Sequence, residues 1–269
     1  MKPTELLGRG RTAAVYRNEA GQAVKIFHAG VADGLVQHEA RIAAALAGVC
    51  PVAPDFYGIK DCDGRPALLY QLIEGTALIE WFRREEVDIA GLASRLAAVH
   101  RSVHAAAATR LPTMAQAWAP KLRQYGQLST AGIERLLDFI DRDPVRKICH
   151  GDLHPENAME DSNGQLWAID WTNAYSGHPL SDMARTVYLL RYGLPPEQAR
   201  IGAAEKALRE QGVEVFLESY GGSDPRQDPD WPVWWLLVLI GRCSERIGAE
   251  QSDIDRMIAQ SLAARPEFA

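Results

Sequence analysis

The sequence predicts an α+β protein with a small lobe of antiparallel strands and a larger helical lobe. Short apolar segments separated by glycine-containing turns fill residues 1–75. Apolar residues at helical spacing dominate residues 76–269. A chain of 269 residues also has the length of two lobes that share a cleft. We therefore expect the boundary between the lobes near residue 75.

The small lobe is expected to hold five strands and one helix. Turns at 8–10, 19–21 and 61–64 separate most of the strands. A helix is predicted over residues 31–46, where apolar residues recur at helical spacing and alanines fill the gaps. The expected strands are residues 6–7, 13–17, 22–27, 56–59 and 66–73.

The large lobe is expected to be helical apart from two short strands. Residues 88–107 predict a strong helix, with Asp88 near its start and an apolar face that includes Leu96. Strands are predicted at 147–149 and 166–169. Further helices are expected at 114–126, 130–141, 180–192, 196–219, 231–247 and 252–264, the last with Ser252 as its N-cap.

Composition narrows the class of protein. The chain is 47% hydrophobic and 24% charged, which is ordinary for a globular enzyme and too apolar for disorder. A net charge of −6 argues against nucleic-acid binding, which usually needs a basic face. The most apolar run, residues 231–240, is too short to span a membrane. The start of the chain lacks a signal-peptide core and the four cysteines form no Cys-x-x-Cys pair, so a cytoplasmic protein with reduced thiols is expected.

Residues 150–157 read His-Gly-Asp-Leu-His-Pro-Glu-Asn, and an Ile-Asp-Trp segment follows after a short hairpin. Transfer of a phosphoryl group from ATP requires such a set. Asp152 is the expected base or orienter of the accepting hydroxyl. Asn157 and Asp170 would supply oxygen ligands to Mg²⁺. His154 stands where a cation would contact the transferred group, and a structural histidine is the alternative.

A Gly-x-Gly turn lies between the first two expected strands. Gly8 and Gly10 lack a Cβ, so backbone N–H groups there would approach phosphate oxygens closely. A plain hairpin turn explains the same residues equally simply. The turn is interpreted as a phosphate-binding loop only together with the other residues of the set.

Lys25 interrupts the third expected strand. An ammonium buried without a partner is costly, so a triphosphate and a carboxylate are expected beside it. Glu39 lies well inside the following helix and is the favoured acid, with Asp33 and Glu74 as the other candidates. The alternative is a lysine that extends to solvent.

The last strand of the small lobe leads into the connection between the lobes. Backbone N–H and C=O groups at Gln71 and Leu72 are expected to contact the purine base. The sequence does not distinguish ATP from GTP as the nucleotide.

Residues 150–157 resemble the catalytic loop of the aminoglycoside phosphotransferase-like family, the small-molecule kinase branch of the protein-kinase-like fold. Residues 169–171 resemble its metal-binding segment, and residues 179–185 resemble the helix start that follows. The resemblance implies a bilobal protein-kinase-like fold, ATP (or GTP) with Mg²⁺, and an Asp182 that braces the catalytic loop through backbone hydrogen bonds. Ala13 departs from the kinase pattern, because it replaces a glycine of the phosphate loop.

The acceptor is expected to be a small hydroxyl compound, such as an aminoglycoside-like antibiotic, an amino-alcohol or a sugar. Only residues 171–181 separate Asp170 from Asp182, which is short for the activation segment of a protein kinase. The acidic loop that contains Asp224, Asp228 and Asp230 would bind a cationic group, or it is simply a solvated loop. Trp234 would line the acceptor pocket through a cation–π contact, or it belongs to the core.

Three functions remain open from the sequence. The favoured one is an ATP- and Mg²⁺-dependent small-molecule phosphotransferase. A nucleotide-binding pseudokinase without catalysis is the second, and a protein kinase is the third. The oligomeric state is not determined by the sequence.

Overall fold

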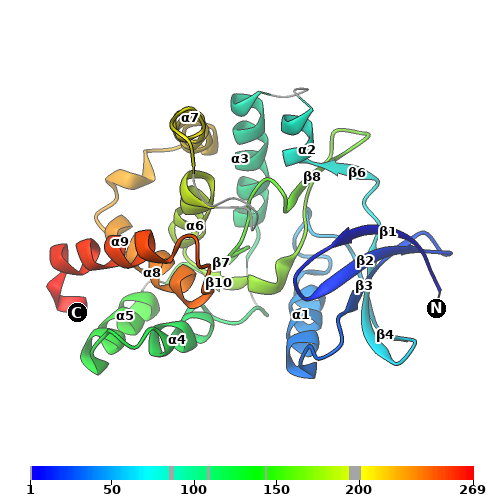
Figure 1. Ribbon diagram of the computed structural model, residues 1–269, viewed down its shortest axis with the longest axis horizontal. Coiled ribbons are helices and arrows are strands. Elements are labelled where there is room, and N and C mark those ends of the chain that lie inside the picture. Colours follow the sequence, from blue (N-terminus) through cyan, green and yellow to red (C-terminus); the bar gives the residue numbers. More distant parts are fainter. Residues whose placement is uncertain (1, 85–87, 108–109, 143, 194–200) are drawn as a thin grey trace.

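The computed structural model describes residues 2–84, 88–107, 110–142, 144–193 and 201–269. A strand-rich small lobe lies beside a larger helical lobe, with the chain termini at opposite ends of the molecule (Figure 1). The predicted α+β class is therefore confirmed. The short strands of the large lobe lie between these two parts.

The small lobe is built on an antiparallel sheet with the strand order β1-β2-β3-β5-β4. Along the central strand, Val24 and Ile26 pack on one side of the sheet, whereas Phe27 packs on the other against helix α1 (Asp33–Leu46). Side chains alternate along a strand, so Lys25 shares the side of Phe27 and faces α1. The strands are β1 (Pro3–Arg9), β2 (Ala13–Asn18), β3 (Gln22–Phe27), β4 (Phe56–Cys62) and β5 (Arg65–Gln71).

Short strand pairs hold the segments between the lobes. A β8–β9 hairpin carries Asn157 just before its first strand and Asp170 just after its second. The sequence predicted β7, β9 and the hairpin that contains β9, but not β6 or β10. These strands are β6 (Gly75–Ala77), β7 (Lys147–Cys149), β8 (Ala158–Asp161), β9 (Leu166–Ala168) and β10 (Tyr175–Gly177), paired as β6-β8-β9 and β10-β7.

Helix α6 (Pro179–Tyr192) runs through the middle of the large lobe (Figure 1). Its Val187 packs in a core with α3 and α7, and its Tyr188 packs in a second core with α4, α5, α8 and α9. Because α6 packs tightly on both sides, its position in the large lobe is fixed, and so is the position of residues at its start. The other helices are α2 (Leu78–Arg83), α3 (Ile89–Ala105), α4 (Met114–Tyr125), α5 (Thr130–Arg142), α7 (Ala203–Tyr220), α8 (Trp231–Ser244) and α9 (Gln251–Ala264).

Helix starts show where local sequence decides the structure and where it does not. Asp88 caps α3, because its carboxylate accepts the backbone N–H of Gly91 at 2.8 Å. The predicted Ser252 cap of α9 is wrong: the helix begins at Gln251, and Glu250 stands at the cap position. The Glu250 carboxylate binds Arg242 instead of the helix end, so a buried ion pair sets this start.

Part of one predicted helix, residues 196–200, lies outside the described residues, and α7 begins at Ala203. None of the helices in the described part of the chain combines the length and apolar character that crossing a bilayer requires.

Candidate active site

Lys25 forms the centre of a buried charge cluster between β3 and α1. Its Nζ lies 2.8 Å from Glu39 Oε1 and 3.1 Å from Asp170 Oδ1. The Lys25 and Glu39 side chains are only 14% and 5% exposed. Burial acts to lower the pKa of Lys25, but Asp170 and Glu39 more than offset it and the pKa is raised. Glu39 is thus the acid that pairs with Lys25, whereas Glu74 pairs with Arg17 on the surface.

Asp170 adopts a backbone conformation that is uncommon for a residue with a side chain, with φ at 59°. The Thr172 hydroxyl lies 3.0 Å from both Asp170 Oδ1 and Glu39 Oε2, so it links the two carboxylates. Burial acts to raise the pKa of Asp170, but Lys25 outweighs it and the pKa is lowered. The carboxylate is therefore ionised, and with 52% of the side chain exposed it is open to a ligand. Thr172 was not identified from the sequence.

Asp182 braces the catalytic loop from the start of α6. Its two carboxylate oxygens accept the backbone N–H groups of His150 and Gly151, each at 2.8 Å. The fully buried carboxylate also lies 3.0 Å from His104 Nε2. Hydrogen bonds of this kind stabilise a buried carboxylate in its ionised form. The bracing role that the family resemblance implied is confirmed.

The same loop packs directly on the segment that follows β9. The His150 ring contacts the Ile169 carbonyl at 3.0 Å. Gly151 has a φ of 77°, and a Cβ at this position would lie 2.3 Å from the Asn173 carbonyl oxygen. Only glycine fits both conditions. These contacts fix the catalytic loop against the segment that carries Asp170.

Asp152 is held by Arg185, whose Nη2 lies 2.7 Å from Asp152 Oδ1. Glu245 binds the same nitrogen at 2.8 Å, and the Arg185 side chain is only 7% exposed. Burial acts to raise the pKa of Asp152, but Arg185 and then His154 outweigh it and the pKa is lowered. Asp152 is therefore ionised at neutral pH, as a base or orienter requires. The role of Arg185 was not identified from the sequence. It lies one helical turn after Asp182, so both side chains face the same loop.

Asn157 is oriented by its own loop. Its Nδ2 donates to the Asp152 carbonyl at 2.9 Å and lies 3.2 Å from His154 Nε2. Burial lowers the pKa of His154, while Asp152 and Glu156 act in the opposite direction. Contact of His154 with the transferred group stays a prediction, beside the alternative of a structural histidine that supports Asn157. Within the described part of the chain, no group donates to Asn157 Oδ1.

The residues expected to hold Mg²⁺ are brought together by the β8–β9 hairpin. The Ile169 N–H donates to the Asn157 carbonyl at 2.9 Å, so Asn157 lies across from the residue before Asp170. One amide oxygen and one ionised, half-exposed carboxylate are the hard ligands that Mg²⁺ prefers beside a polyphosphate. The residues present thus fit a magnesium ion.

The Gly-x-Gly turn joins β1 to β2 on the Lys25 sheet. Gly8 pairs with Val15, and Val15 pairs with Lys25, so Gly8 stands in the same row of the sheet as the lysine. Gly8 is exposed, and no atom lies within 4 Å of the position of an added Cβ. The Gly10 N–H closes the hairpin on the Ala13 carbonyl at 2.8 Å. Its N–H is therefore used by the turn itself.

Gln71 ends β5 and Leu72 begins the connection to β6. The Gln71 N–H donates to the Asp55 carbonyl at 2.8 Å, so it is already used within the small lobe. The Gln71 side chain accepts from the Asp55 N–H at 3.3 Å. The expectation of a purine contact is therefore corrected for the Gln71 N–H, whereas the contacts expected of the Gln71 carbonyl and of the Leu72 backbone stay predictions.

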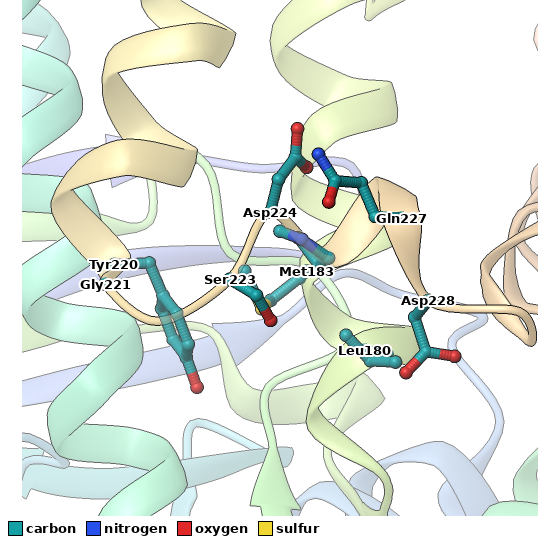
Figure 2. A pocket seen from close by; sticks show the side chains of 9 residues that line it. Leu180, Met183, Tyr220, Gly221, Ser223, Asp224, Gln227 and Asp228 are labelled. Atoms are coloured by element: carbon teal, nitrogen blue, oxygen red, sulfur yellow. The ribbon is translucent and has the colours of Figure 1, made fainter.

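A cavity of about 330 Å³ lies between the start of α6, the end of α7 and the short helix Pro225–Gln227 (Figure 2). Asp224 and Asp228 line it, but both carboxylates have partners. Asp224 binds Arg226 at 2.8 Å, and Asp228 accepts the Asp230 N–H at 2.8 Å. Asp230 itself lies 3.7 Å from Arg142 and is not among the residues that line this cavity.

Trp234 is a core residue. Its side chain is 1% exposed, and it stacks on His178 with a centroid distance of 5.5 Å and packs on Phe139 at 4.6 Å. The interpretation of Trp234 as a pocket residue was therefore wrong. Nearly all residues at the start of α8 are apolar, so the sequence pattern did not distinguish a tryptophan in the core from an exposed one.

A second cavity, of about 20 Å³, adjoins the catalytic loop and shares no residue with the first. Gly151, next to Asp152, lines it together with Arg185. Helices α4 and α8 contribute Lys121 and Glu245 to its wall. Sequence analysis missed these two residues, because charged positions on amphipathic helices are usually solvated.

Comparison with known proteins gives one family and many similar folds. The Phosphotransferase enzyme family matches residues 4–214. No curated protein matches the sequence.

Solved structures resemble the chain over nearly its whole length. Choline kinase LicA from Streptococcus pneumoniae has a TM-score of 0.56 and 17% identity, with 98% of this chain and 94% of that chain covered. A ternary complex of APH(2″)-IIa with streptomycin and ATP has a TM-score of 0.55 and 15% identity, covering 99% and 94%. Macrolide 2′-phosphotransferase MphH from Brachybacterium faecium has a TM-score of 0.50 and 20% identity, covering 96% and 91%. At these identities the likeness is one of fold.

Proposed function

Because the chain belongs to the Phosphotransferase enzyme family, we propose that it transfers the γ-phosphate of ATP, with Mg²⁺, to a hydroxyl group of a small molecule. The observation that supports this most strongly is the contact of Lys25 with both Glu39 and Asp170, at 2.8 and 3.1 Å. This contact joins the small lobe to the segment beside the catalytic loop. Structures of similar fold include complexes with AMP and with ATP, which supports nucleotide binding by this chain.

In the proposed reaction, Asp152 accepts a hydrogen bond from the acceptor hydroxyl and takes its proton as the oxygen attacks the γ-phosphorus. The new O–P bond forms while the bond from the γ-phosphorus to the bridging oxygen breaks, and ADP leaves. Lys25 contacts phosphate oxygens, and Asn157 and Asp170 hold the ion. When bound, Mg²⁺ neutralises charge on the phosphates. Arg185 keeps Asp152 ionised and oriented.

The test is nucleotide-dependent phosphate transfer to a panel of acceptors. ADP release should require Mg²⁺ and one class of compound among amino-alcohols, aminoglycosides, macrolides, sugars and their acidic derivatives. Replacing Asp152 by Ala should lower kcat by about 10²–10⁴-fold and leave ATP binding intact. A D152A variant with full activity would remove Asp152 from the proposed role. Parallel assays with GTP would identify the phosphate donor.

The two alternative functions predict different results in the same assay. A pseudokinase would bind ATP with Mg²⁺ in a thermal-shift titration and turn over none of the acceptors. A protein kinase would phosphorylate generic protein substrates. The segment between Asp170 and α6 argues against the latter, because a short helix (Trp171–Asn173) and β10 occupy most of it. It leaves little chain to dock a peptide.

A further inference from the structure

The 20 Å³ cavity beside the catalytic loop carries two cationic side chains whose hydrogen-bonding capacity is incompletely used. Arg185 reaches it from α6 and Lys121 from α4. Gly151 forms part of the same wall, so the cavity adjoins the residue that would orient the acceptor hydroxyl. A ligand group in this cavity would belong to the acceptor rather than to the nucleotide.

Arg185 has a buried donor without a partner. Both of its carboxylate partners, Asp152 and Glu245, bind through Nη2. Its Nε is buried and, among the residues that the structure describes, has no hydrogen-bond partner. The arginine is 6% exposed, so water does not readily satisfy this donor. Buried donors without partners are rare and mark places where a ligand or ordered water is expected.

Lys121 is a second donor without an acceptor. Within the described part of the chain it forms neither an ion pair nor a hydrogen bond, and its Nζ lies 5.1 Å from the centroid of the Trp118 ring. Burial lowers the pKa of Lys121, the charge of Arg185 lowers it further, and Glu245 and Asp152 offset only part of this. Burial is the largest of these causes, so the Lys121 ammonium lies in a poorly solvated place without an acceptor of its own.

Glu245, the one acidic residue among the described residues that line this cavity, is already engaged. Glu245 binds Arg185 through Oε1 at 2.8 Å and Arg242 through Oε2 at 2.6 Å. It is therefore a poor partner for a positively charged acceptor. An ammonium group placed here would face Lys121 and Arg185, and like charges at close range repel.

We infer that this cavity binds an anionic oxygen of the acceptor, so that the substrate is a hydroxyl compound carrying a carboxylate or phosphate group. This inference rests on the proposed function. One oxygen-sized group fits in 20 Å³, and the rest of the acceptor lies outside toward Asp152. Lys121 Nζ and Arg185 Nε donate to the anion, and charge-assisted bonds of this kind are the stronger ones. The expectation of a cationic acceptor rested on the acidic loop with Asp224, Asp228 and Asp230, whose carboxylates each have a partner within the protein.

The test compares matched acceptors. A panel of hydroxy acids and sugar phosphates is assayed beside the corresponding methyl esters, unphosphorylated sugars and amino-alcohols. We expect turnover to be confined to the acidic members. Preference for carboxylates or for phosphates distinguishes the two sources of the anion. Turnover of only neutral or cationic acceptors would overturn the inference while supporting the proposed phosphotransferase.

Variants of Lys121 sharpen the test. K121M should raise KM for the acidic acceptor roughly 10- to 100-fold while KM for ATP stays unchanged, and K121R should restore most of the affinity. Lys206 is exposed on α7 and supplies a matched charge change in K206M, which should behave as the natural protein does. An unchanged KM in K121M would contradict the anion site.

A binding measurement separates this inference from the reaction. With ADP and Mg²⁺ filling the nucleotide site, inorganic phosphate and acetate should raise Tm of the natural chain and of K206M but not of K121M. If no acceptor is turned over yet this pattern is seen, the anion site stands and the proposed reaction fails. Equal responses of the natural chain and K121M would overturn the anion site.

Discussion

The two lysines of the candidate site differ in how the protein balances their charge. Lys25 has carboxylate oxygens at 2.8 and 3.1 Å, whereas Lys121 has no ion-pair partner in the described part of the chain. Burial opposes the charge of both, yet the pKa of Lys25 is raised and that of Lys121 is lowered. A balanced buried charge contributes to both stability and activity, whereas an unbalanced one beside a cavity indicates ligand binding.

The largest expected effect concerns the balanced lysine. Replacing Lys25 by Met leaves Glu39 buried without its partner and should lower the free energy of unfolding by about 3–5 kcal/mol. The double variant K25M/E39Q should recover much of this stability but no activity. Urea unfolding together with ADP-release assays measures both quantities. By contrast, K121M should unfold at the same denaturant concentration as the natural chain or a higher one. Equal destabilisation by K25M and K121M would show that the two sites do not differ.

A smaller loss is expected when the brace of the catalytic loop is removed. Asp182→Ala leaves the buried N–H groups of His150 and Gly151 without an acceptor, which should cost about 2–3 kcal/mol. Asp182→Asn keeps one acceptor oxygen and should cost less. The decline in kcat should follow the loss of loop order while ATP binding persists. If D182A is as stable as the natural chain in thermal or urea unfolding, Asp182 does not stabilise the catalytic loop.

The dependence of activity on pH tests the contact between Arg185 and Asp152. The pKa of Asp152 is lowered in the folded protein, so its ionised form persists at pH values below the usual titration range of a carboxyl group and is lost only as pH falls through the depressed value. In Arg185→Met the attraction is removed, and the acid limb of kcat/KM should move to higher pH by about one unit. Activity measured between pH 3 and 7 shows the shift. If the acid limb does not move in Arg185→Met, Arg185 does not control the ionisation of Asp152.

The smallest effect is expected in the other cavity. Asp228→Asn keeps the shape of the loop and an oxygen that accepts the Asp230 N–H. If the acceptor binds beside Gly151, kcat/KM for every acceptor should change by less than about twofold, an effect below about 0.5 kcal/mol. A large rise in KM for cationic acceptors in D228N would transfer the acceptor site to the larger cavity.

Sequence patterns predicted most of the fold, because local rules govern it. The alternation along β3, the helical period of α1 and α3 and the Asp88 cap each depend on residues close together in the chain. The short strands β6 and β10 were missed, since strands of so few residues carry no period. The Ser252 cap failed because the buried Arg242–Glu250 ion pair outweighed a local preference.

Residue types and spacing alone predicted the residues proposed to hold the nucleotide and to orient the acceptor hydroxyl: Lys25, Glu39, Asp152, Asn157 and Asp170 stand in a characteristic order. Only the tertiary structure gave the arrangement from which the acceptor site is inferred. Trp234 entered the core and Asp224 found Arg226, whereas Lys121 and Arg185 met in one cavity from helices far apart in the sequence. The physical reason is that burial and unsatisfied donors are properties of packing between distant segments, which no local pattern encodes.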